Sequence, residues 1–263
     1  NAAGDNKLPF SERWIMASPP TSLSSVAHRT IRRTCVNCAL SELCVPVGLD
    51  QTDMERLDQL VGRQKPLPAN AHLCRIGERF SALYAVRSGC FKSYRMDREG
   101  RERVLAFHLP GELMGLDAIY PGVYQSNIVA LDVGGVCALP YNDLSRLATQ
   151  IPRLQEQIFR LLSKDLSAYA WLGGDHSAEE RVAGFLLDLS NRYRERGYSD
   201  RAFNLAMPRR DIANYLRLAT ETVSRVITRF ERQGLIRTER REVQLLDLDG
   251  LNERANHCLQ VTV

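Results

Sequence analysis

The spacing of apolar residues changes along the chain. Over 51–61 the apolar side chains recur at three- and four-residue steps, which predicts a short helix. From 76 to 140, short β-prone runs alternate with turn signals, and a glycine returns every 11 or 12 residues. Short strands with turns at such intervals are typical of a β-sandwich or barrel. The predicted strands of this β domain include 82–86, 104–108 and 127–131.

A long helical pattern follows the β domain. Pro152 opens it, and seven apolar residues recur at three- and four-residue steps: Leu154, Ile158, Leu161, Leu162, Leu166, Tyr169 and Leu172. This stripe can pack on the adjacent β domain or on the same helix of a second copy. Because Asp165 interrupts a strict heptad, the sequence leaves both arrangements open. Gly173 and Gly174 predict the end of the helix and a hinge.

Further elements are predicted in the C-terminal part of the chain. Ser177 and Glu180 form a capping-box signature, S-x-x-E, ahead of a helix. A brief strand is predicted at 203–206. Two more strands, at 235–240 and 242–246, are joined by Glu-Arg-Arg, which predicts a wing with a basic tip that contacts phosphates.

Two helices joined by a four-residue turn, 207–216 and 220–233, are predicted between these strands. The second has one apolar side for burial: Val223, Val226, Ile227 and Phe230. Its opposite side carries Glu221, Ser224 and Arg225 near the N-terminus, as a recognition helix requires. In the major groove, Arg can donate two hydrogen bonds to guanine and Glu can accept one from cytosine. An i,i+4 surface salt bridge between Glu221 and Arg225 is the plainer alternative.

Composition and charge narrow the class of protein. The 263 residues are 44% hydrophobic, which excludes global disorder, and no apolar run approaches the ~18 residues of a membrane span. With no secretion signal at the N-terminus, we expect a cytoplasmic protein of two domains. Between Arg192 and Arg241 there are 13 Arg and 6 acidic residues, a charge of +7, which leaves 4 − 7 = −3 elsewhere. Such a basic segment suggests contact with a polyanion, most simply a nucleic acid backbone, but charge alone fits a solvated, Arg-rich helical surface equally well.

Three of the seven cysteines, Cys35, Cys38 and Cys44, lie within ten residues as C-x2-C-x5-C. Tetrahedral zinc usually draws on a second nearby C-x2-C pair, which the chain lacks. An iron–sulfur cluster accepts three clustered ligands and one distant one. The residues alone leave four candidates for that fourth ligand: Cys74, Cys90, Cys137 and Cys258. The sequence contains no G-x-G-x-x-G or G-x-S-x-G motif, so nothing favours an enzyme.

From about Cys35 to the C-terminus, the chain resembles the CRP/FNR family of bacterial transcription regulators, and among them the oxygen-sensing FNR type. The motifs that carry the resemblance are C-x2-C-x5-C followed by Pro46, LYAVRSG at 83–89, KSY at 92–94, FHLPGE at 107–112 and ETVSR at 221–225. The resemblance implies an α+β fold with an N-terminal cyclic-nucleotide-type β-roll, a long dimerisation helix and a C-terminal winged helix-turn-helix. The implied division is a flexible leader 1–34, a cluster-binding segment and sensor domain 35–151, the dimerisation helix 152–174 and the DNA-binding domain 175–263.

The same resemblance implies a 4Fe–4S cluster on Cys35, Cys38, Cys44 and Cys137, which oxygen converts or destroys. The intact form is expected to be a homodimer that binds a TTGAT-type palindrome in double-stranded DNA, with RNA polymerase as a further partner, and to control anaerobic genes. The implied DNA-binding residues are Glu221, Ser224, Arg225, Thr220, Thr222 and Arg209. A family member that responds to zinc, nitric oxide or thiol redox is the alternative.

Some positions depart from the family pattern. Leu116 and Gln125 stand where the nucleotide-binding members have Glu and Arg, so we expect no cyclic nucleotide ligand. Arg217 replaces the usual Gly of the helix–turn–helix turn, where a left-handed conformation costs on the order of 1 kcal/mol. Ala219 replaces a Ser or Thr cap, with Thr220 as the substitute cap.

Overall fold

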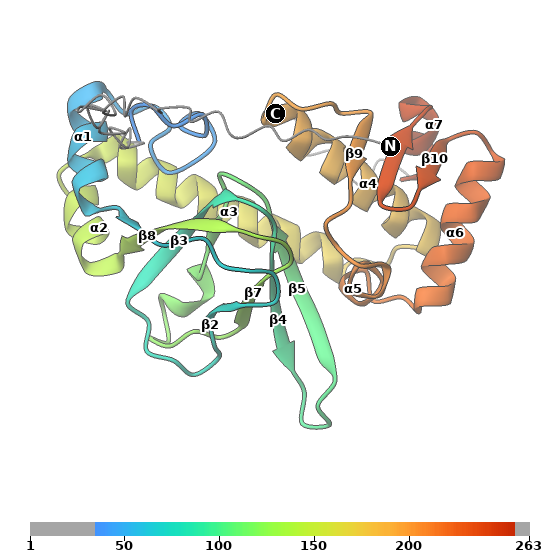
Figure 1. The fold of residues 1–263 in the computed structure, drawn as a ribbon, viewed down its shortest axis with the longest axis horizontal. Coiled ribbons are helices and arrows are strands. Elements are labelled where there is room, and N and C mark those ends of the chain that lie inside the picture. The colour runs from blue at the N-terminus through green and yellow to red at the C-terminus, as the bar shows by residue number, and fades with distance from the viewer. Residues whose placement is uncertain (1–34, 256–263) are drawn as a thin grey trace, which may run out of the picture. The chain divides into compact units, whose positions relative to one another are not determined.

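The computed structural model describes residues 35–255, and all of them belong to one compact unit (Figure 1). The predicted leader 1–34 and Cys258 lie outside the described residues. A β domain, a long helix and a helical C-terminal domain with a small sheet follow one another, so the predicted α+β fold is confirmed. Within 35–255 no helix is both long and apolar enough to cross a membrane.

The β domain consists of two four-stranded antiparallel sheets. The first has the order β1-β8-β3-β6, formed by Gly62–Arg63, Gly135–Pro140, Ala82–Ser88 and Leu113–Met114. The second has the order β2-β7-β4-β5, formed by His72–Cys74, Asn127–Ala130, Phe91–Met96 and Glu102–His108. Val86 and Val136 of the first sheet pack in one cluster with Phe91 and Ile128 of the second, so the two sheets share a core. The predicted sandwich-like β domain is confirmed.

The regular glycine series marks turns of this domain. All five glycines, 77, 89, 100, 111 and 122, have a positive φ, which side chains other than glycine rarely adopt. Gly89, between β3 and β4, has φ 76°, and a Cβ at this position would lie 2.7 Å from the Cα of Gly134. The turn therefore needs glycine both for its backbone angle and for the close approach of the 132–134 loop.

The outer face of the first sheet is covered by helices. They are α1 Gln51–Leu60, α2 Tyr141–Ala148 and α3 Pro152–Gly173, while a 3₁₀ turn, η1 Leu116–Ala118, follows β6. Leu83 and Ala85 of β3 contact this layer, in a cluster with Leu57, Leu144 and Leu154. Alternate residues of β3 thus face opposite layers, and this sheet is buried on both sides.

The apolar stripe of α3 divides between two environments. Leu154 is fully buried, and Ile158 and Leu161 pack on the same cluster as α2. Leu166 and Tyr169 of the stripe are 71% and 39% exposed, and so is the nearby Phe159, which was not predicted to belong to it, at 60%. Of the two arrangements left open by the sequence, packing on the β domain is therefore observed for one part of the stripe. The other part remains accessible.

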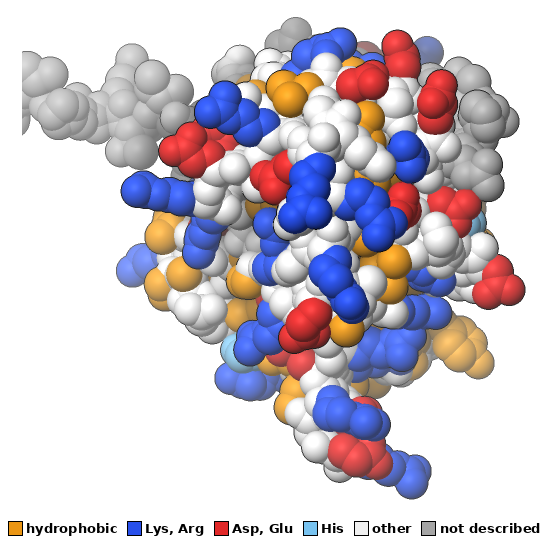
Figure 2. All heavy atoms as spheres, turned by 90° about the vertical axis from the view of Figure 1, so that its right-hand side faces the viewer, with side chains coloured by type: hydrophobic (Ala, Val, Ile, Leu, Met, Phe, Trp, Pro, Cys, Tyr) orange, Lys and Arg blue, Asp and Glu red, His pale blue; other side chains and the backbone are white. Residues whose placement is uncertain are grey.

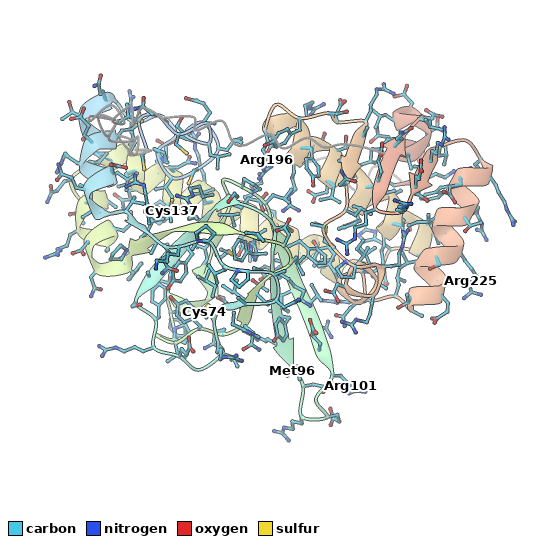
Figure 3. All side chains as sticks on the ribbon, in the orientation of Figure 1. Cys74, Met96, Arg101, Cys137, Arg196 and Arg225 are labelled. Carbon is cyan, nitrogen blue, oxygen red and sulfur yellow. The ribbon has the colours of Figure 1, made fainter. Side chains whose placement is uncertain are left out.

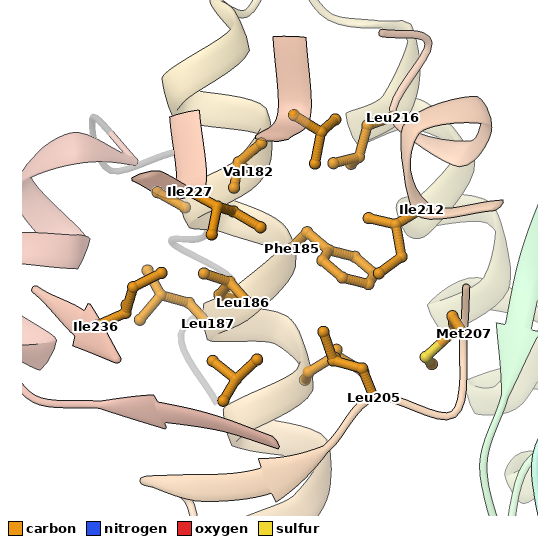
Figure 4. Packing of buried hydrophobic residues seen from close by; sticks show 14 of the residues in the cluster. Val182, Phe185, Leu186, Leu187, Leu205, Met207, Ile212, Leu216, Ile227 and Ile236 are labelled. Atoms are coloured by element: carbon orange, nitrogen blue, oxygen red, sulfur yellow. The ribbon is translucent and has the colours of Figure 1, made fainter. Parts of the chain in front are cut away.

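The C-terminal domain is built around α4. Its elements are α4 Ala178–Glu195, β9 Ala202–Asn204, α5 Arg209–Tyr215, α6 Thr220–Arg232, β10 Ile236–Glu239, β11 Glu242–Leu245 and α7 Leu248–Arg254. Phe185 and Leu186 of α4 meet side chains from α5, α6 and β10 in its core (Figure 4). The capping box is confirmed, with Ser177 N–H donating to Glu180 Oε2 at 2.6 Å and Glu180 N–H donating to Ser177 Oγ at 3.2 Å. The three-stranded antiparallel sheet β10-β11-β9 contains the predicted wing, whereas α7 was not predicted.

The β domain and the C-terminal domain share an interface with both apolar and charged contacts. The ring of Phe107 on β5 lies 6.3 Å from that of Phe185 and 5.3 Å from that of Tyr215, between centroids. Beside these rings, the carboxylate of Glu112 accepts hydrogen bonds from Arg192 at 2.6 and 2.9 Å and from Arg196 at 2.7 Å. Arg192 lies in α4 and Arg196 directly follows it, so the carboxylate of Glu112 links the β domain to the C-terminal domain.

We predict that this junction is sensitive to acid. Burial by itself raises the pKa of Glu112, but Arg192 and Arg196 outweigh burial and hold the pKa at about 2, below the ordinary 4.5. A carboxylate with a depressed folded-state pKa contributes stability that is present above its unfolded pKa and is lost as the pH falls towards the folded value. Glu112→Gln should therefore lower the free energy of unfolding at neutral pH, and its effect should shrink as the pH falls below about 4.5.

Urea unfolding over a pH series measures this difference. Glu239→Gln, at an exposed wing position, is the matched control and should change neither stability nor its pH dependence. A destabilisation by Glu112→Gln that stayed constant with pH would contradict the prediction.

Candidate functional site

Residues 35–49 form a series of tight turns beside α1. Cys38 N–H donates to Cys35 O at 3.3 Å, and Cys44 N–H donates to Leu40 O at 3.0 Å, so the three thiols are held on one folded segment. Asp58 of α1 accepts the N–H of Cys35 at 2.8 Å and also pairs with Arg63. The first cysteine is thereby fixed to the β domain by a carboxylate that no sequence pattern had indicated.

Cys137 reaches the same place from the middle of a sheet. It lies on β8 (Figure 3), opposite Ala85 of β3 and Arg63 of β1. One cavity is lined by the thiols of Cys35, Cys38, Cys44 and Cys137. Most of its other lining residues are apolar: Leu40, Val45, Pro46, Leu57, Val61, Ala85, Val86 and Leu139. The structure thus places around one cavity all four cysteines that the resemblance implied as ligands.

The thiols share an electrostatic environment. Burial raises the pKa of Cys35 to about 12, and the charge of Asp58 adds to the effect. Burial likewise raises the pKa of Cys44 to about 12 and raises that of Cys137. Each of these thiols also feels the charge of another cysteine across the cavity, including Cys38. Burial and the neighbouring cysteines therefore favour the protonated form of Cys35, Cys44 and Cys137 in the chain by itself.

Two other cysteines that the spacing left open lie elsewhere. Cys74 is buried in the core between the two sheets, and Cys90 is buried with Phe107 at the domain interface. Neither lines the cavity of the N-terminal cysteines. Among residues 35–255, no three His, Cys, Asp or Glu side chains are grouped as ligands of a single metal ion.

The α5–α6 pair has the geometry of a helix–turn–helix. Arg217 takes the left-handed conformation expected of the turn, with φ 57°. Ala219 is the N-cap of α6 and makes no side-chain capping bond. Thr220 is already the first residue of the helix, so the idea that it replaces the missing cap is wrong. A serine, threonine, aspartate or asparagine at position 219 could make that bond.

The exposed side of α6 carries the predicted base-reading residues. Glu221, Ser224 and Arg225 are all exposed, and Arg225 points away from the protein (Figure 3). The guanidinium of Arg225 donates to Thr222 Oγ1 at 3.4 Å, and it is Thr222 rather than Glu221 that contacts it. Figure 2, which views the α6 side, shows Lys and Arg side chains over much of this face with acidic side chains between them. The arrangement suits a polyanionic partner.

The structure adds a detail to Arg209, which the sequence analysis named, and shows a groove beside α6 that the sequence analysis did not predict. Arg209, at the start of α5, is half-buried, and within the described part of the chain its Nη1 has no hydrogen-bond partner. A groove beside α6 is lined by Arg225, Arg229 and Arg254, and Glu179 of α4 pairs with the last two. The i,i+4 spacing of Arg225 and Arg229 could have indicated that these two share a face.

Comparison with known domain families agrees with this geometry. The profile of the Crp-like helix-turn-helix domain matches residues 180–254, and that of the cyclic nucleotide-binding domain matches residues 64–150. The chain is 43% identical over 216 residues to the transcriptional activator protein anr of Pseudomonas aeruginosa, covering 81% of this chain and 88% of that protein. It is 37% identical over 230 residues to the fumarate and nitrate reduction regulatory protein of Escherichia coli K12, covering 86% and 92%.

The chain belongs to the CRP/FNR family, in its FNR/Anr type. Among solved structures, FixK2 from Bradyrhizobium japonicum aligns with a TM-score of 0.64 and 26% identity, over 73% of this chain and 96% of that one. A CRP-family regulator from Thermus thermophilus, at 0.61 and 23% identity over 76% and 100%, shows the same fold. This FNR/Anr-type protein is therefore a DNA-binding transcription regulator rather than an enzyme, and the family prediction is confirmed.

Proposed function

We propose that this chain is an oxygen-responsive regulator that holds a 4Fe–4S cluster on Cys35, Cys38, Cys44 and Cys137. The observation that carries the proposal is the cavity that these four thiols line, although one of them is separated from the others by more than ninety residues. Four thiolate ligands, three clustered and one remote, are a set that iron–sulfur clusters accept. The names of two relatives, "Anaerobic regulatory protein" in Haemophilus influenzae and "Fumarate and nitrate reduction regulatory protein" in Escherichia coli, support a role in anaerobic gene control.

The residues around the cavity fit this role. When bound, the cluster would supply an oxygen-sensitive link between residues 35–44 and β8. The lining around the partly buried cysteines is mostly apolar, and Asp58 holds the backbone of Cys35 in place. From Cys137 the chain passes through the end of β8 directly into α2 and then α3. A change at the cavity therefore has a short covalent route to the exposed side of α3.

We predict that Cys137→Ser removes the cluster. Anaerobically purified wild type should contain iron and sulfide and absorb visible light, whereas the variant should lose most of all three because one of four ligands is gone. Cys74→Ala, which alters a cysteine outside the cavity, is the control and should retain them. A colourless, iron-free wild-type protein would refute the cluster and favour the zinc, nitric oxide or thiol-redox alternative.

We further propose that the regulator is a homodimer through α3. Phe159, Leu166 and Tyr169 form an exposed apolar strip on a long helix, which a second copy of the helix would bury. The adjoining strip is already covered by the β domain, so the helix is held at a fixed angle to its own subunit. A symmetric dimer places two recognition helices about one DNA turn apart, as a palindromic site requires.

Leu166→Asp tests the dimer. A charge placed in an apolar interface loses the burial of the leucine, roughly 1.5–3 kcal/mol, and adds the cost of desolvation. Sedimentation of the anaerobic protein should show monomers at concentrations where wild type is dimeric. Ser167→Asp, an exposed polar position of the same helix, should leave the dimer intact. Equal dissociation constants for both variants would rule out this interface.

The DNA-binding domain is proposed to read a TTGAT-type half-site with Glu221, Ser224 and Arg225. Thr220, Thr222 and Arg209 are proposed to contact the backbone, because they lie at the N-terminal ends of α5 and α6. The exposed wing tip at Arg240 and Arg241 offers two further phosphate contacts. Together these side chains supply both sequence reading and salt-dependent affinity.

Arg225→Ala should weaken sequence discrimination. Loss of a bidentate contact to guanine should reduce operator affinity by roughly 1–3 kcal/mol, while salt-dependent binding to unrelated DNA persists. Fluorescence anisotropy with operator and scrambled duplexes measures both quantities. Arg232→Ala, at the C-terminal end of the same helix, should keep the preference for the operator. An unchanged ratio of the two affinities in Arg225→Ala would show that another residue reads the site.

Two remaining proposals concern a cyclic nucleotide ligand and RNA polymerase. Leu116 packs in the apolar cluster under α2, and the side chain of Gln125 donates to Val123 O at 3.2 Å. Neither offers a cation to a nucleotide phosphate, so we propose that the β domain takes no cyclic nucleotide. As a regulator of transcription, the protein is proposed to act in the bacterial cytoplasm together with RNA polymerase.

A further inference from the structure

The first helix of the helix–turn–helix is hydrogen-bonded to the edge of the β domain. β5 is the last strand of its sheet, so one side of its backbone has no strand partner. Asn214 of α5 occupies that edge: its Oδ1 accepts Val104 N–H at 2.7 Å, and its Nδ2 donates to Glu102 O at 2.6 Å. The side-chain amide of Asn214, in the C-terminal domain, thus takes the place of a neighbouring strand at this edge of the β domain. Its two hydrogen bonds together fix the orientation of the amide.

A buried ion pair lies one helical turn away. Lys92 Nζ on β4 is 2.8 Å from Asp211 Oδ2 on α5, and the two side chains are only 7% and 5% exposed. Lys92 also pairs with Glu102 of β5. Breaking a buried pair leaves an uncompensated charge, which is strongly unfavourable. The pair and the amide therefore hold the same helix at two points three residues apart.

These contacts differ in kind from the apolar part of the interface. The rings of Phe107, Phe185 and Tyr215 exclude water but tolerate small sliding, because apolar attraction has no direction. Hydrogen bonds weaken steeply once the donor–acceptor geometry bends far from linear, and an ion pair weakens as its two charges move apart. The polar contacts are thus what fixes the rotation of α5 on the β domain.

The docking leaves the DNA-reading side of α6 free. Asp211 and Asn214 face the β domain, whereas Glu221, Ser224 and Arg225 are exposed. The contacts are therefore compatible with operator binding and do not mask it. Because α5 and α6 share a buried core, the orientation given to α5 passes to α6.

We propose that Lys92, Asp211 and Asn214 are positioning residues for operator recognition. By holding α5 on β4 and β5, they set the angle at which each recognition helix leaves its subunit. In a dimer, the two recognition helices must enter two half-sites about one turn of DNA apart at the same time. A small rotation of α5 therefore moves the recognition helix of its subunit out of this spacing. This inference rests on the proposed dimeric regulator, and the experiment below separates the two.

Asn214→Ala is the first variant, with Asn204→Ala as the matched control. Asn204 is exposed on β9, where its backbone pairs with Glu242 of β11 and its carbonyl oxygen accepts a hydrogen bond from the Tyr193 hydroxyl. Anaerobic full-length proteins are titrated with three duplexes: a TTGAT palindrome, the same palindrome with one base pair added at its centre, and a single half-site. Wild type and Asn204→Ala should strongly prefer the unaltered palindrome. Asn214→Ala should bind it about tenfold more weakly, bind the half-site as wild type does, and discriminate less between the two spacings.

A second set of variants separates positioning from folding. Lys92→Met removes the buried partner of the Asp211 carboxylate and leaves it only the longer, 3.5 Å pair with the exposed Arg210, so the charge of Asp211 should lower the thermal unfolding temperature. Adding Asp211→Leu removes that charge and should restore the unfolding temperature, because an apolar pair can replace a buried ion pair. We expect the stable double variant still to show the weakened spacing preference, since an apolar contact does not fix rotation.

The other outcomes of these titrations would overturn either the positioning role alone or the proposed operator as well. Wild-type spacing preference in Asn214→Ala and in the double variant would overturn the positioning role alone. An equal loss on the palindrome and the half-site would place the damage in the recognition helix, and would overturn it as well. A wild-type protein with no preference for the TTGAT palindrome would refute the proposed operator, and the positioning role with it.

Discussion

The register of β8 between β1 and β3 is the constraint on which the proposed sensor depends. Val136 faces the core between the two sheets, and the next residue, Cys137, faces the opposite side towards the cysteine turns. Successive side chains of a strand alternate between faces, so a slip of one residue would turn this thiol into the sandwich. The backbone bonds that pair Cys137 with Ala85 and Arg63 therefore determine where the fourth sulfur lies.

The same sheet also links the cavity with the rest of the molecule. It is buried on both faces, against the second sheet on one side and against α1, α2 and α3 on the other. Because protein interiors are closely packed, the turns of residues 35–49 can move in only a few directions. The helix α3 lies in this outer layer and presents Leu166 to solvent, so the cavity and the proposed dimer surface belong to one packed layer.

Charge has two different roles in the C-terminal half. Arg225 and the wing arginines are exposed and available to a partner, whereas Arg192 and Arg196 are committed to Glu112 within the chain. A count of arginines between 192 and 241 cannot separate these roles, because it records charge and not burial. Part of the basic excess is structural, although the conclusion drawn from the excess, a nucleic acid partner, agrees with the family.

Local patterns in the sequence were enough for five of the helices, though not for α2 or α7, and for the family. Helical periodicity, glycine at positive φ and the Ser177 capping box depend on neighbouring residues, so they can be recognised without a fold. The motif at 221–225 likewise indicates a recognition helix, because the helical period places Glu221, Ser224 and Arg225 on the exposed side and Val223 on the buried one. Only the tertiary structure decided which contacts form between distant segments: that Cys137 joins the N-terminal thiols, that Asp58 anchors Cys35, and that Asn214 and Asp211 bind the edge of the β domain. Such contacts depend on strand register and domain docking, which arise from the packing of the whole chain and leave no periodic trace in the sequence.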